Sequence, residues 1–380
     1  MTSSMNVAFI VGNRPQFMKA AIVERAWRKS IHKDDINMML IHTGQHYDEN
    51  LSGIFFKELG ISEPKYNLKI GSGHSIEQIT SIMKKLYVIF SNEKPNAVAV
   101  YGDTNSTIGA ALAAVHLNIP VIHIEAGERL FVRQNQPEEI NRVVTDTLSS
   151  LCLTASRKAR AFLKQEGFND TRIKFTGDTM YDLFLWAQEK TKNQSNYMLE
   201  KHNLFQENYV LSTLHRAENT DNSNRLHNLL SALDNSDLDV IFPLHPRTKN
   251  AIEKLGWAPK KALRFIEPCG YLDLIALLKN AKYTITDSGG LSRESYWAKK
   301  QSFVPMSAPP WAEIQALGWM TLVNPDHPIS FSSDILTARM NNYDDTLFGD
   351  GSAGEKIISS IYKFITCPSG SEELWRTDRQ

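Results

Sequence analysis

Short apolar, β-branched runs alternate with helical stretches along almost the whole chain. Such runs between turn signals are typical of buried strands, and Ala-rich or amphipathic stretches are typical of the helices that connect them. We expect strands at residues 6–11, 36–41, 97–101, 120–124, 151–153, 173–175, 209–213, 240–244, 265–266 and 283–286, and helices at 75–90, 105–116, 159–165, 271–279, from 291 and at 354–364. Strand, helix and strand in so little sequence predict parallel βαβ units and a doubly wound α/β fold.

The alternation comes in two series, which indicates two domains. A chain of 380 residues is too long for one ordinary hydrophobic core. Residues 183–207 are polar and helical and contain no Gly or Pro, so we interpret them as the link. We expect an N-terminal Rossmann-like domain at 1–182 and a C-terminal one at 183–353, facing each other across a cleft, followed by a helix and tail at 354–380.

Composition narrows the class of protein. The formal net charge is zero, hydrophobic residues make up 42% and charged residues 22%, which is typical of a soluble globular chain. No basic excess favours nucleic acid or a membrane as a partner. No run approaches a transmembrane span, residues 1–20 lack a signal-peptide core, and the three cysteines are scattered, so a reducing cytoplasm is the expected location. No His, Asp and Glu set has metal-ligand spacing, so no metal is expected.

Acidic residues gather between residues 96 and 142. Asp103 comes after one expected strand and Glu125 after the next, while Glu138 and Glu139 come after Pro137 at the start of a helix. The carboxyl ends of parallel strands meet at one edge of a sheet, so these acids can face one ligand and move protons in both directions. Each acid alone is better explained as a helix cap or turn residue. The joint pattern indicates a site.

Two further motifs in the first half suit a ligand. Gly12 opens a turn before a helix whose first residues include Arg14 and Lys19, an arrangement that can hold a phosphate, although such an Arg is more often in a surface ion pair. Gln45 and His46 follow the second strand in a polar cluster, where a solvated loop is the simpler interpretation.

The second half carries the better anion site. Asp287 is followed by Ser288, Gly289 and Gly290 at the start of a helix, where small residues allow a ligand to approach backbone N–H groups. Glu294, expected in the first turn of that helix, either stabilises its dipole or accepts ribose hydroxyls. Positive side chains follow the other strands of this half: His215, Arg216, His245 and Arg247. A phosphate-rich ligand on one domain and acids on the other fit a nucleotide-sugar.

These motifs together resemble the non-hydrolysing UDP-N-acetylglucosamine 2-epimerase family in order and spacing. The matching segments are RPQFMK at 14–19, TGQH at 43–46, GDT at 102–104, EAG at 125–127, PEEINR at 137–142 and DSGG at 287–290. VGNRPQF, TGQHYDEN, YGDTNST, LHRAENTD and PLHPRT look like the branch that acts on UDP-2,3-diacetamido uronic acids.

The resemblance implies a glycosyltransferase-B-like fold whose final helix crosses back to the first domain. It implies a homodimer that takes a UDP-sugar and uses no cofactor. In the implied reaction, a base removes the C2 proton, UDP leaves from C1 to give a 2-acetamidoglycal, and UDP adds again with protonation of the opposite face. Such enzymes serve surface-polysaccharide synthesis.

By the same resemblance, individual residues acquire roles. Asp103, Glu125 and Glu138 are acid/base candidates, and His215 assists UDP departure. The residues implied to bind the diphosphate, ribose or sugar are Arg14, Lys19, His245, Arg247, Ser288, Gly289, Gly290 and Glu294. Gln45 and His46 match a region that holds a second, regulatory nucleotide-sugar in some members.

One loop departs from the family pattern. The family usually has a charged loop of the form RD-x-T-E-(R/W)-x-E, and here residues 306–313 read MSAPPWAE, so only Trp311 and Glu313 align. Arg293 and Glu128 also differ from the usual residues. These changes leave alternatives to epimerisation: a hydrolysing enzyme that releases free sugar and UDP, a glycosyltransferase of similar fold, or a non-catalytic nucleotide-sugar binder.

Overall fold

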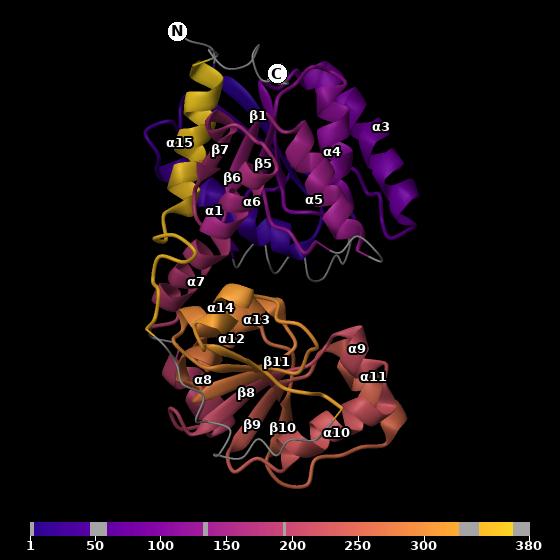
Figure 1. Ribbon diagram of the computed structural model, residues 1–380, viewed down its shortest axis with the longest axis vertical. Coiled ribbons are helices and arrows are strands. Elements are labelled where there is room, and N and C mark those ends of the chain that lie inside the picture. Colours follow the sequence, from indigo (N-terminus) through magenta and orange to yellow (C-terminus); the bar gives the residue numbers. More distant parts are fainter. Residues whose placement is uncertain (1–3, 46–58, 132–135, 193–194, 327–341, 368–380) are drawn as a thin grey trace. The chain divides into compact units, whose positions relative to one another are not determined.

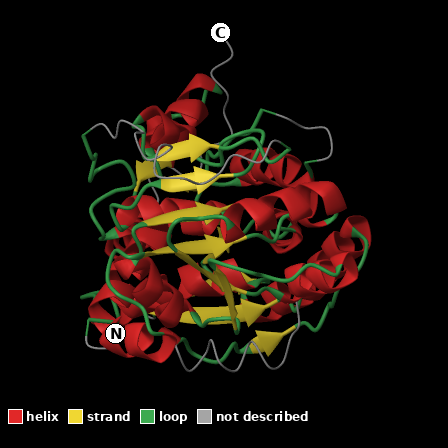
Figure 2. Cartoon of the chain, turned by 90° about the horizontal axis from the view of Figure 1, so that it is seen from below, coloured by secondary structure: helices red, strands yellow, loops and turns green. Residues whose placement is uncertain are grey.

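The computed structural model describes residues 4–45, 59–131, 136–192, 195–326 and 342–367. The chain forms two compact units. Unit 1 contains Met1–Leu183 and Asp345–Gln380, and unit 2 contains Phe184–Asp344. In each unit a parallel sheet lies between helices on both of its faces (Figures 1 and 2). None of the described helices is long and apolar enough to cross a membrane.

Unit 1 is built on a seven-stranded sheet with the order β3-β2-β1-β4-β5-β6-β7. Its strands are β1 Met5–Val11, β2 Ile36–His42, β3 Tyr66–Asn67, β4 Ala97–Tyr101, β5 Val121–Ile124, β6 Leu151–Thr154 and β7 Ile173–Phe175. Its helices are α1 Arg14–Lys29, α3 Ser75–Glu93, α4 Asn105–Val115, α5 Pro137–Leu148, α6 Arg157–Gln165 and α15 Ala353–Thr366. The central strands β4 and β5 are buried along their whole length, which explains why β4 reads as a continuous apolar run and β5 is apolar except for His123.

Unit 2 repeats the plan with six strands in the order β10-β9-β8-β11-β12-β13. The strands are β8 Tyr209–Thr213, β9 Asp239–Pro243, β10 Leu263–Ile266, β11 Tyr283–Thr286, β12 Ser302–Val304 and β13 Met320–Leu322. The helices are α8 Ser195–His202, α9 Ala217–Thr220, α10 Ser223–Asp234, α11 Pro246–Leu255, α12 Tyr271–Asn280, α13 Gly289–Trp297 and α14 Ala312–Ala316. The strand order of both sheets confirms the expected doubly wound fold.

Most of residues 183–207 belong to helices, as the sequence predicts, namely the end of α7 Thr179–Lys190 and all of α8, and the division between the units falls within α7. Helix α13 begins at Gly289 rather than Leu291, because Ser288 is its N-cap and accepts a hydrogen bond from the backbone N–H of Leu291. Both glycines of DSGG are therefore helical residues.

The final helix α15 packs along α1 of unit 1, as Figure 1 shows. A Cβ placed on Gly354 would lie 2.9 Å from the Cβ of Ala26 and 3.0 Å from the carbonyl oxygen of Ile22, so the two helices touch through glycine. The carboxylate of Asp182 accepts hydrogen bonds from the backbone N–H groups of Ala353 and Gly354 and so caps α15. The fold thus returns the chain end to unit 1.

The strand order reverses once in each unit, between β1 and β4 in unit 1 and between β8 and β11 in unit 2. In doubly wound sheets, ligands bind outside the carboxyl ends of the strands at this switch point. The loops that follow these strands are therefore the first places to look for functional side chains.

Candidate active site

The turn after β1 in unit 1 is joined to the turn after β4 by one glutamine. Gln16 accepts a hydrogen bond from the backbone N–H of Gly12 at 2.7 Å and donates to the carbonyl oxygen of Tyr101 at 2.7 Å. A Cβ at Gly12 would lie 2.0 Å from the hydroxyl of Ser106, so only glycine fits there. Arg14 lies exposed at the start of α1, where Asn13 is the N-cap. The β1 turn is thus packed against the start of α4.

Asp103 follows β4 at the switch point and is half-buried. It pairs with Arg142 of α5, and Arg142 also donates to Glu139 at 2.9 Å. The side-chain amide of Asn141 donates to the backbone carbonyl of Asp103 at 2.9 Å. Sequence reasoning placed Asp103 at the site but assigned no role to Arg142 or Asn141, although both lie within PEEINR.

Glu125 follows β5, the strand next to β4, and its carboxylate pairs with Lys19 of α1. Its backbone φ is +67°, in the left-handed region that a residue with a side chain seldom adopts. Such a conformation costs about 1–3 kcal/mol and is concentrated at functional sites. The positive φ turns the chain out of β5 just where the acidic side chain is needed.

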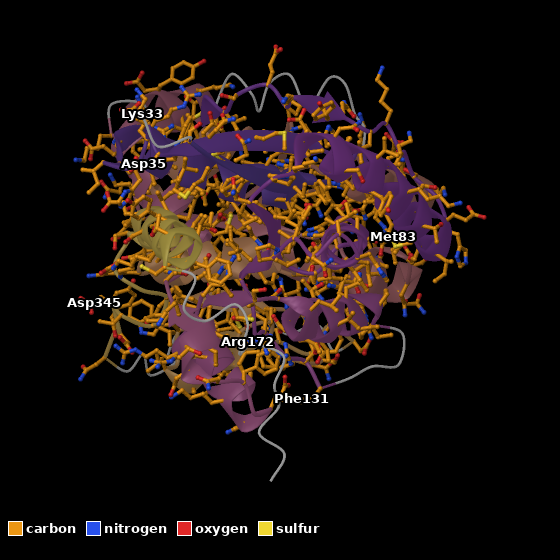
Figure 3. The ribbon with its side chains drawn as sticks, turned by 90° about the horizontal axis from the view of Figure 1, so that it is seen from above. Lys33, Asp35, Met83, Phe131, Arg172 and Asp345 are labelled. Carbon is orange, nitrogen blue, oxygen red and sulfur yellow. The ribbon has the colours of Figure 1, made fainter. Side chains whose placement is uncertain are left out.

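The two glutamates at the start of α5 occupy different environments. Glu138 is exposed, whereas Glu139 is buried and accepts hydrogen bonds from the backbone N–H groups of Leu130 and Phe131. Phe131 lies at the edge of unit 1 (Figure 3) and is 67% exposed. Glu139 therefore fixes the backbone at Leu130 and Phe131, and Glu138 is the member of the pair that is accessible to a ligand.

Gln45 is buried in unit 1. Its side-chain oxygen accepts two hydrogen bonds from Ser106, one from the hydroxyl at 2.8 Å and one from the backbone N–H at 3.3 Å. The hydroxyl of Ser106 also contacts that of Thr43. Gln45 thus joins the end of β2 to the first turn of α4. His46 lies outside the described residues, so a regulatory site at this position stays a prediction.

In unit 2, Asp287 organises the turns that follow β8 and β11. Its fully buried carboxylate accepts hydrogen bonds from the backbone N–H groups of His215 and Arg216 and from the amide of Asn219. The Nδ1 of His215 lies 3.2 Å from Asp287. Burial alone raises the pKa of Asp287, but the hydrogen bonds from His215 and Asn219 outweigh it and lower this pKa. Asp287 thus stays charged and orients His215.

The first turn of α13 is open to a ligand. A Cβ on Gly290 would be 3.6 Å from its nearest neighbour, the hydroxyl of Ser288, and a Cβ on Gly289 would be 3.6 Å from Pro310. Neither residue has a positive φ, so the packing and backbone do not demand glycine at either position. Backbone N–H groups in the first turn of a helix lack intrahelical partners and bind anions.

The remaining predicted residues of unit 2 differ in how they are placed. Glu294 is buried in the second turn of α13, which removes the helix-dipole role that needs the first turn. The ring of His245 lies 5.9 Å from that of His215, and its Nδ1 accepts from the backbone N–H of Arg247. Arg247 forms an exposed ion pair with Asp221. His245 is thus beside His215, whereas the guanidinium of Arg247 is turned to a surface partner.

Comparison with known proteins identifies the family. The model of the family described as UDP-N-acetylglucosamine 2-epimerase matches residues 29–362. The chain belongs to the UDP-N-acetylglucosamine 2-epimerase family. It is 42% identical over 366 residues to a UDP-N-acetylglucosamine 2-epimerase homolog of Methanococcus maripaludis, covering 94% of this chain and 99% of that protein.

Two further relatives have informative names. The chain is 37% identical to the UDP-2,3-diacetamido-2,3-dideoxy-D-glucuronate 2-epimerase of Pseudomonas aeruginosa, over 94% of this chain and all of that protein. A crystal structure of the Methanocaldococcus jannaschii UDP-GlcNAc 2-epimerase in complex with UDP-GlcNAc and UDP matches 94% of this chain and 99% of its own, with a TM-score of 0.81 and 35% identity. The family consists of isomerases, and the chain shares its glycosyltransferase-B-like fold.

The loop that departs from the epimerase family pattern packs onto α13. The indole N–H of Trp311 donates to the carbonyl oxygen of Gly289 at 2.7 Å. The guanidinium of Arg293 lies over Trp311 at 4.3 Å from the ring centroid and over Trp297 at 5.1 Å. Met306, where the family usually has Arg, is buried. The loop thus supports the start of α13 through aromatic contacts.

Proposed function

We propose that the protein epimerises C2 of a UDP-2-acetamido sugar, either UDP-N-acetylglucosamine or a UDP-2,3-diacetamido uronate, for surface-polysaccharide synthesis. Family membership supports the reaction type, and the names of the Pseudomonas aeruginosa and Methanocaldococcus jannaschii relatives support the two sugars. On the sequence resemblance we also propose a homodimer.

The proposed chemistry is an elimination followed by an addition. A base takes the C2 proton, the electron pair of the C2–H bond forms a C1–C2 double bond, and the C1–O bond breaks so that UDP leaves with its electrons. The 2-acetamidoglycal then accepts a proton at the opposite face of C2 while a β-phosphate oxygen attacks C1. No net oxidation occurs, so the reaction needs no redox cofactor. Because the C2 proton is not acidic, charge on the departing UDP must be stabilised.

The observation that carries the proposal is the pairing of two acids with two cations at neighbouring strand ends. Asp103 follows β4 and pairs with Arg142, and Glu125 follows β5 and pairs with Lys19. Glu138 lies exposed at the start of α5, the helix that carries Arg142. Carboxylates held in different environments within one site can take and return a proton. We assign these three acids to the movement of the C2 proton.

In the proposal, unit 2 holds UDP. The first turn of α13, with Ser288, Gly289 and Gly290, binds the diphosphate, and Glu294 accepts ribose hydroxyls. His215, oriented by Asp287, lies one strand away, and we assign it to stabilising the phosphate as UDP leaves. Arg14, Lys19, His245 and Arg247 add positive charge for the diphosphate or the sugar.

Positional isotope exchange tests the elimination. A UDP-sugar with ¹⁸O in the bridge between C1 and the β-phosphorus is incubated with the enzyme and followed by ³¹P NMR. We expect the label to appear in non-bridging positions, because the freed β-phosphate rotates before it adds again. Label that stays in the bridge after many turnovers would contradict elimination.

The altered loop favours one alternative, a hydrolysing enzyme. Met306 replaces a cation that the family pattern places after β12, so UDP and glycal can be held less firmly. Under this alternative, the signals of free UDP accumulate in the same ³¹P experiment while those of the UDP-sugar disappear, and proton NMR shows the free sugar. Accumulation of a UDP-linked epimer without free UDP would exclude hydrolysis.

A further inference from the structure

A buried histidine beneath the acidic site has no role in the proposed chemistry. His123 lies in the middle of β5, two residues before Glu125, and is fully buried. Its Nδ1 lies 2.7 Å from a carboxylate oxygen of Asp146 of α5, and its Nε2 lies 2.7 Å from the carbonyl oxygen of Gly102. The ring therefore joins α5 to the turn after β4.

Both partners of the ring can only accept hydrogen bonds. A carbonyl oxygen has no proton, and Asp146 stays ionised because its charge interactions with His123 and Arg129 outweigh its burial and lower its pKa. Both ring nitrogens must therefore carry hydrogen for the two bonds to form. Asp146 also accepts hydrogen bonds from the backbone N–H of Gly127 at 3.1 Å and from Arg129 at 2.7 Å.

The network continues beyond Asp146. Arg129 pairs with Glu166 as well as with Asp146, so both carboxylates have a cationic partner and Asp146 also bonds the ring of His123. Buried charges are tolerated when they are paired and hydrogen-bonded in this way. The network gives Asp146 a fixed position, and Asp146 in turn fixes the ring of His123.

The other side of the ring leads directly to the acids. Gly102 has a φ of +58° and immediately precedes Asp103, and its backbone N–H donates to the carbonyl oxygen of Ile124 at 3.0 Å. A Cβ on Gly102 would lie 3.3 Å from the carboxylate of Glu125 and 3.7 Å from the ammonium of Lys19. The Gly102–Asp103 peptide thus lies between the imidazole and the Lys19–Glu125 pair.

We propose that His123 is a positioning residue: its ring, anchored by Asp146, holds the carbonyl of Gly102 and so fixes Asp103 beside Glu125. The inference rests on the proposed function for its kinetic part. Misplacement of a reacting group by about 1 Å can cost about 10²-fold in rate. The hydrogen bond to Gly102 is therefore expected to affect the proton transfer and not the binding of UDP.

Two variants separate the two hydrogen bonds of the ring. The amide nitrogen of Gln reaches the place of Nε2, and that of Asn reaches the place of Nδ1. His123→Gln keeps the donor to Gly102, whereas His123→Asn keeps the donor to Asp146. We expect kcat for deuterium exchange at C2 to fall about 10²-fold in His123→Asn and less than about tenfold in His123→Gln, with KM little changed in both. Greater activity in His123→Asn than in His123→Gln would overturn the proposal.

Two readouts do not depend on activity. Amide hydrogen exchange at Asp103 and Thr104 is expected to be faster in His123→Asn and close to the wild type in His123→Gln, and equal rates in the two variants would overturn the inference. In the unmodified protein, ¹⁵N NMR of the histidine side chains should show hydrogen on the Nε2 of His123, because this nitrogen faces the carbonyl oxygen of Gly102. An Nε2 without hydrogen would contradict the geometry even if neither variant folds. Wild type without C2 exchange would refute the proposed function and leave these readouts valid.

Discussion

At the scale of single residues, the site combines strain with charge. Glu125 adopts a φ of +67° while its carboxylate pairs with Lys19, so part of the stability of unit 1 is given up where the acid is needed. In contrast, Gly289 and Gly290 lie where the packing would accept a side chain. The positive φ of Glu125 and the lack of side chains at Gly289 and Gly290 are not required by the packing of the fold. Both are easier to explain by the binding of a ligand.

The strain at Glu125 is measurable with a pair of variants. Neither Glu125→Gly nor Glu125→Ala can pair with Lys19, so the difference between their free energies of unfolding reports the cost of the positive backbone φ. We expect Glu125→Gly to be more stable by about 1 kcal/mol in urea unfolding, because glycine adopts a positive φ freely. The same pair at Glu128, whose φ is not positive, is the control and should not favour Gly. An Ala variant at 125 as stable as the Gly variant would show that the conformation is unstrained.

Gly290→Ala tests whether this residue serves the ligand. Ala is the better helix former, so we expect the variant to keep or gain stability by up to about 1 kcal/mol. The added methyl occupies the approach to the first turn of α13, so the affinity for UDP measured by calorimetry should fall at least about tenfold. Asn224→Ala, at the same position of α10, is the control and should leave UDP affinity unchanged. Unaltered affinity in Gly290→Ala would place the diphosphate elsewhere.

Some of the residues at the candidate site could be predicted from the sequence, and others could not. The places of Asp103 and Glu125 at neighbouring strand ends were predictable, because each comes shortly after a recognisable strand. Arg142 and His123 were not, since their partners lie 39 and 21 residues away in the chain and pair through the order of the strands and the start of α5. Glu138 and Glu139 are neighbours in sequence, and only the structure shows which one is buried.

At the scale of elements, apolar pattern and turn chemistry predicted most of the sheet. The strands β4, β8 and β11 have the expected bounds, because each is a buried apolar run. The short strands β12 and β13, of three residues each, were not foreseen. The start of α13 was misplaced by two residues because glycine is a poor helix former, although it is well suited to a first turn that binds anions.

The cap of α15 makes its docking depend on pH. Burial raises the pKa of Asp182 from 3.8 to about 6, although the hydrogen bonds from Gly354 and Ala353 oppose the increase. Between pH 3.8 and about 6, Asp182 holds a proton in the folded protein but not in the unfolded chain. Its contribution to the free energy of unfolding therefore falls as pH rises from about 4 to about 6 and is constant above that.

Asp182→Asn removes this titration. Hydrogen exchange of α15 gives its opening free energy in the wild type and in Asp182→Asn at each pH. The value for the wild type minus the value for the variant should decrease by about 2 kcal/mol between pH 4.5 and 7.5. Comparison of the two proteins at each pH cancels the intrinsic exchange rate and the titration of other groups. A difference that is the same at both pH values would show that Asp182 titrates normally.

At the scale of the whole molecule, one topology is used twice for different purposes. The six strands of unit 2 follow the same order as the first six strands of unit 1, and both sheets carry polar side chains at the switch point. Unit 1 brings acids and their paired cations to the ends of β4 and β5, whereas unit 2 brings a helix start and an oriented histidine to the ends of β8 and β11. Fold alone does not give this division of labour, since it depends on the side chains that follow each strand.

The function proposed for these side chains is the exchange of the C2 proton of a UDP-2-acetamido sugar. Proton NMR in D₂O with UDP-N-acetylglucosamine, and separately with UDP-2,3-diacetamido-glucuronate, tests this function most directly. We expect the C2 proton signal of one of the two sugars to disappear while a UDP-linked epimer forms, and the sugar that reacts is then the substrate. UDP binding without loss of the C2 signal from either sugar would contradict it.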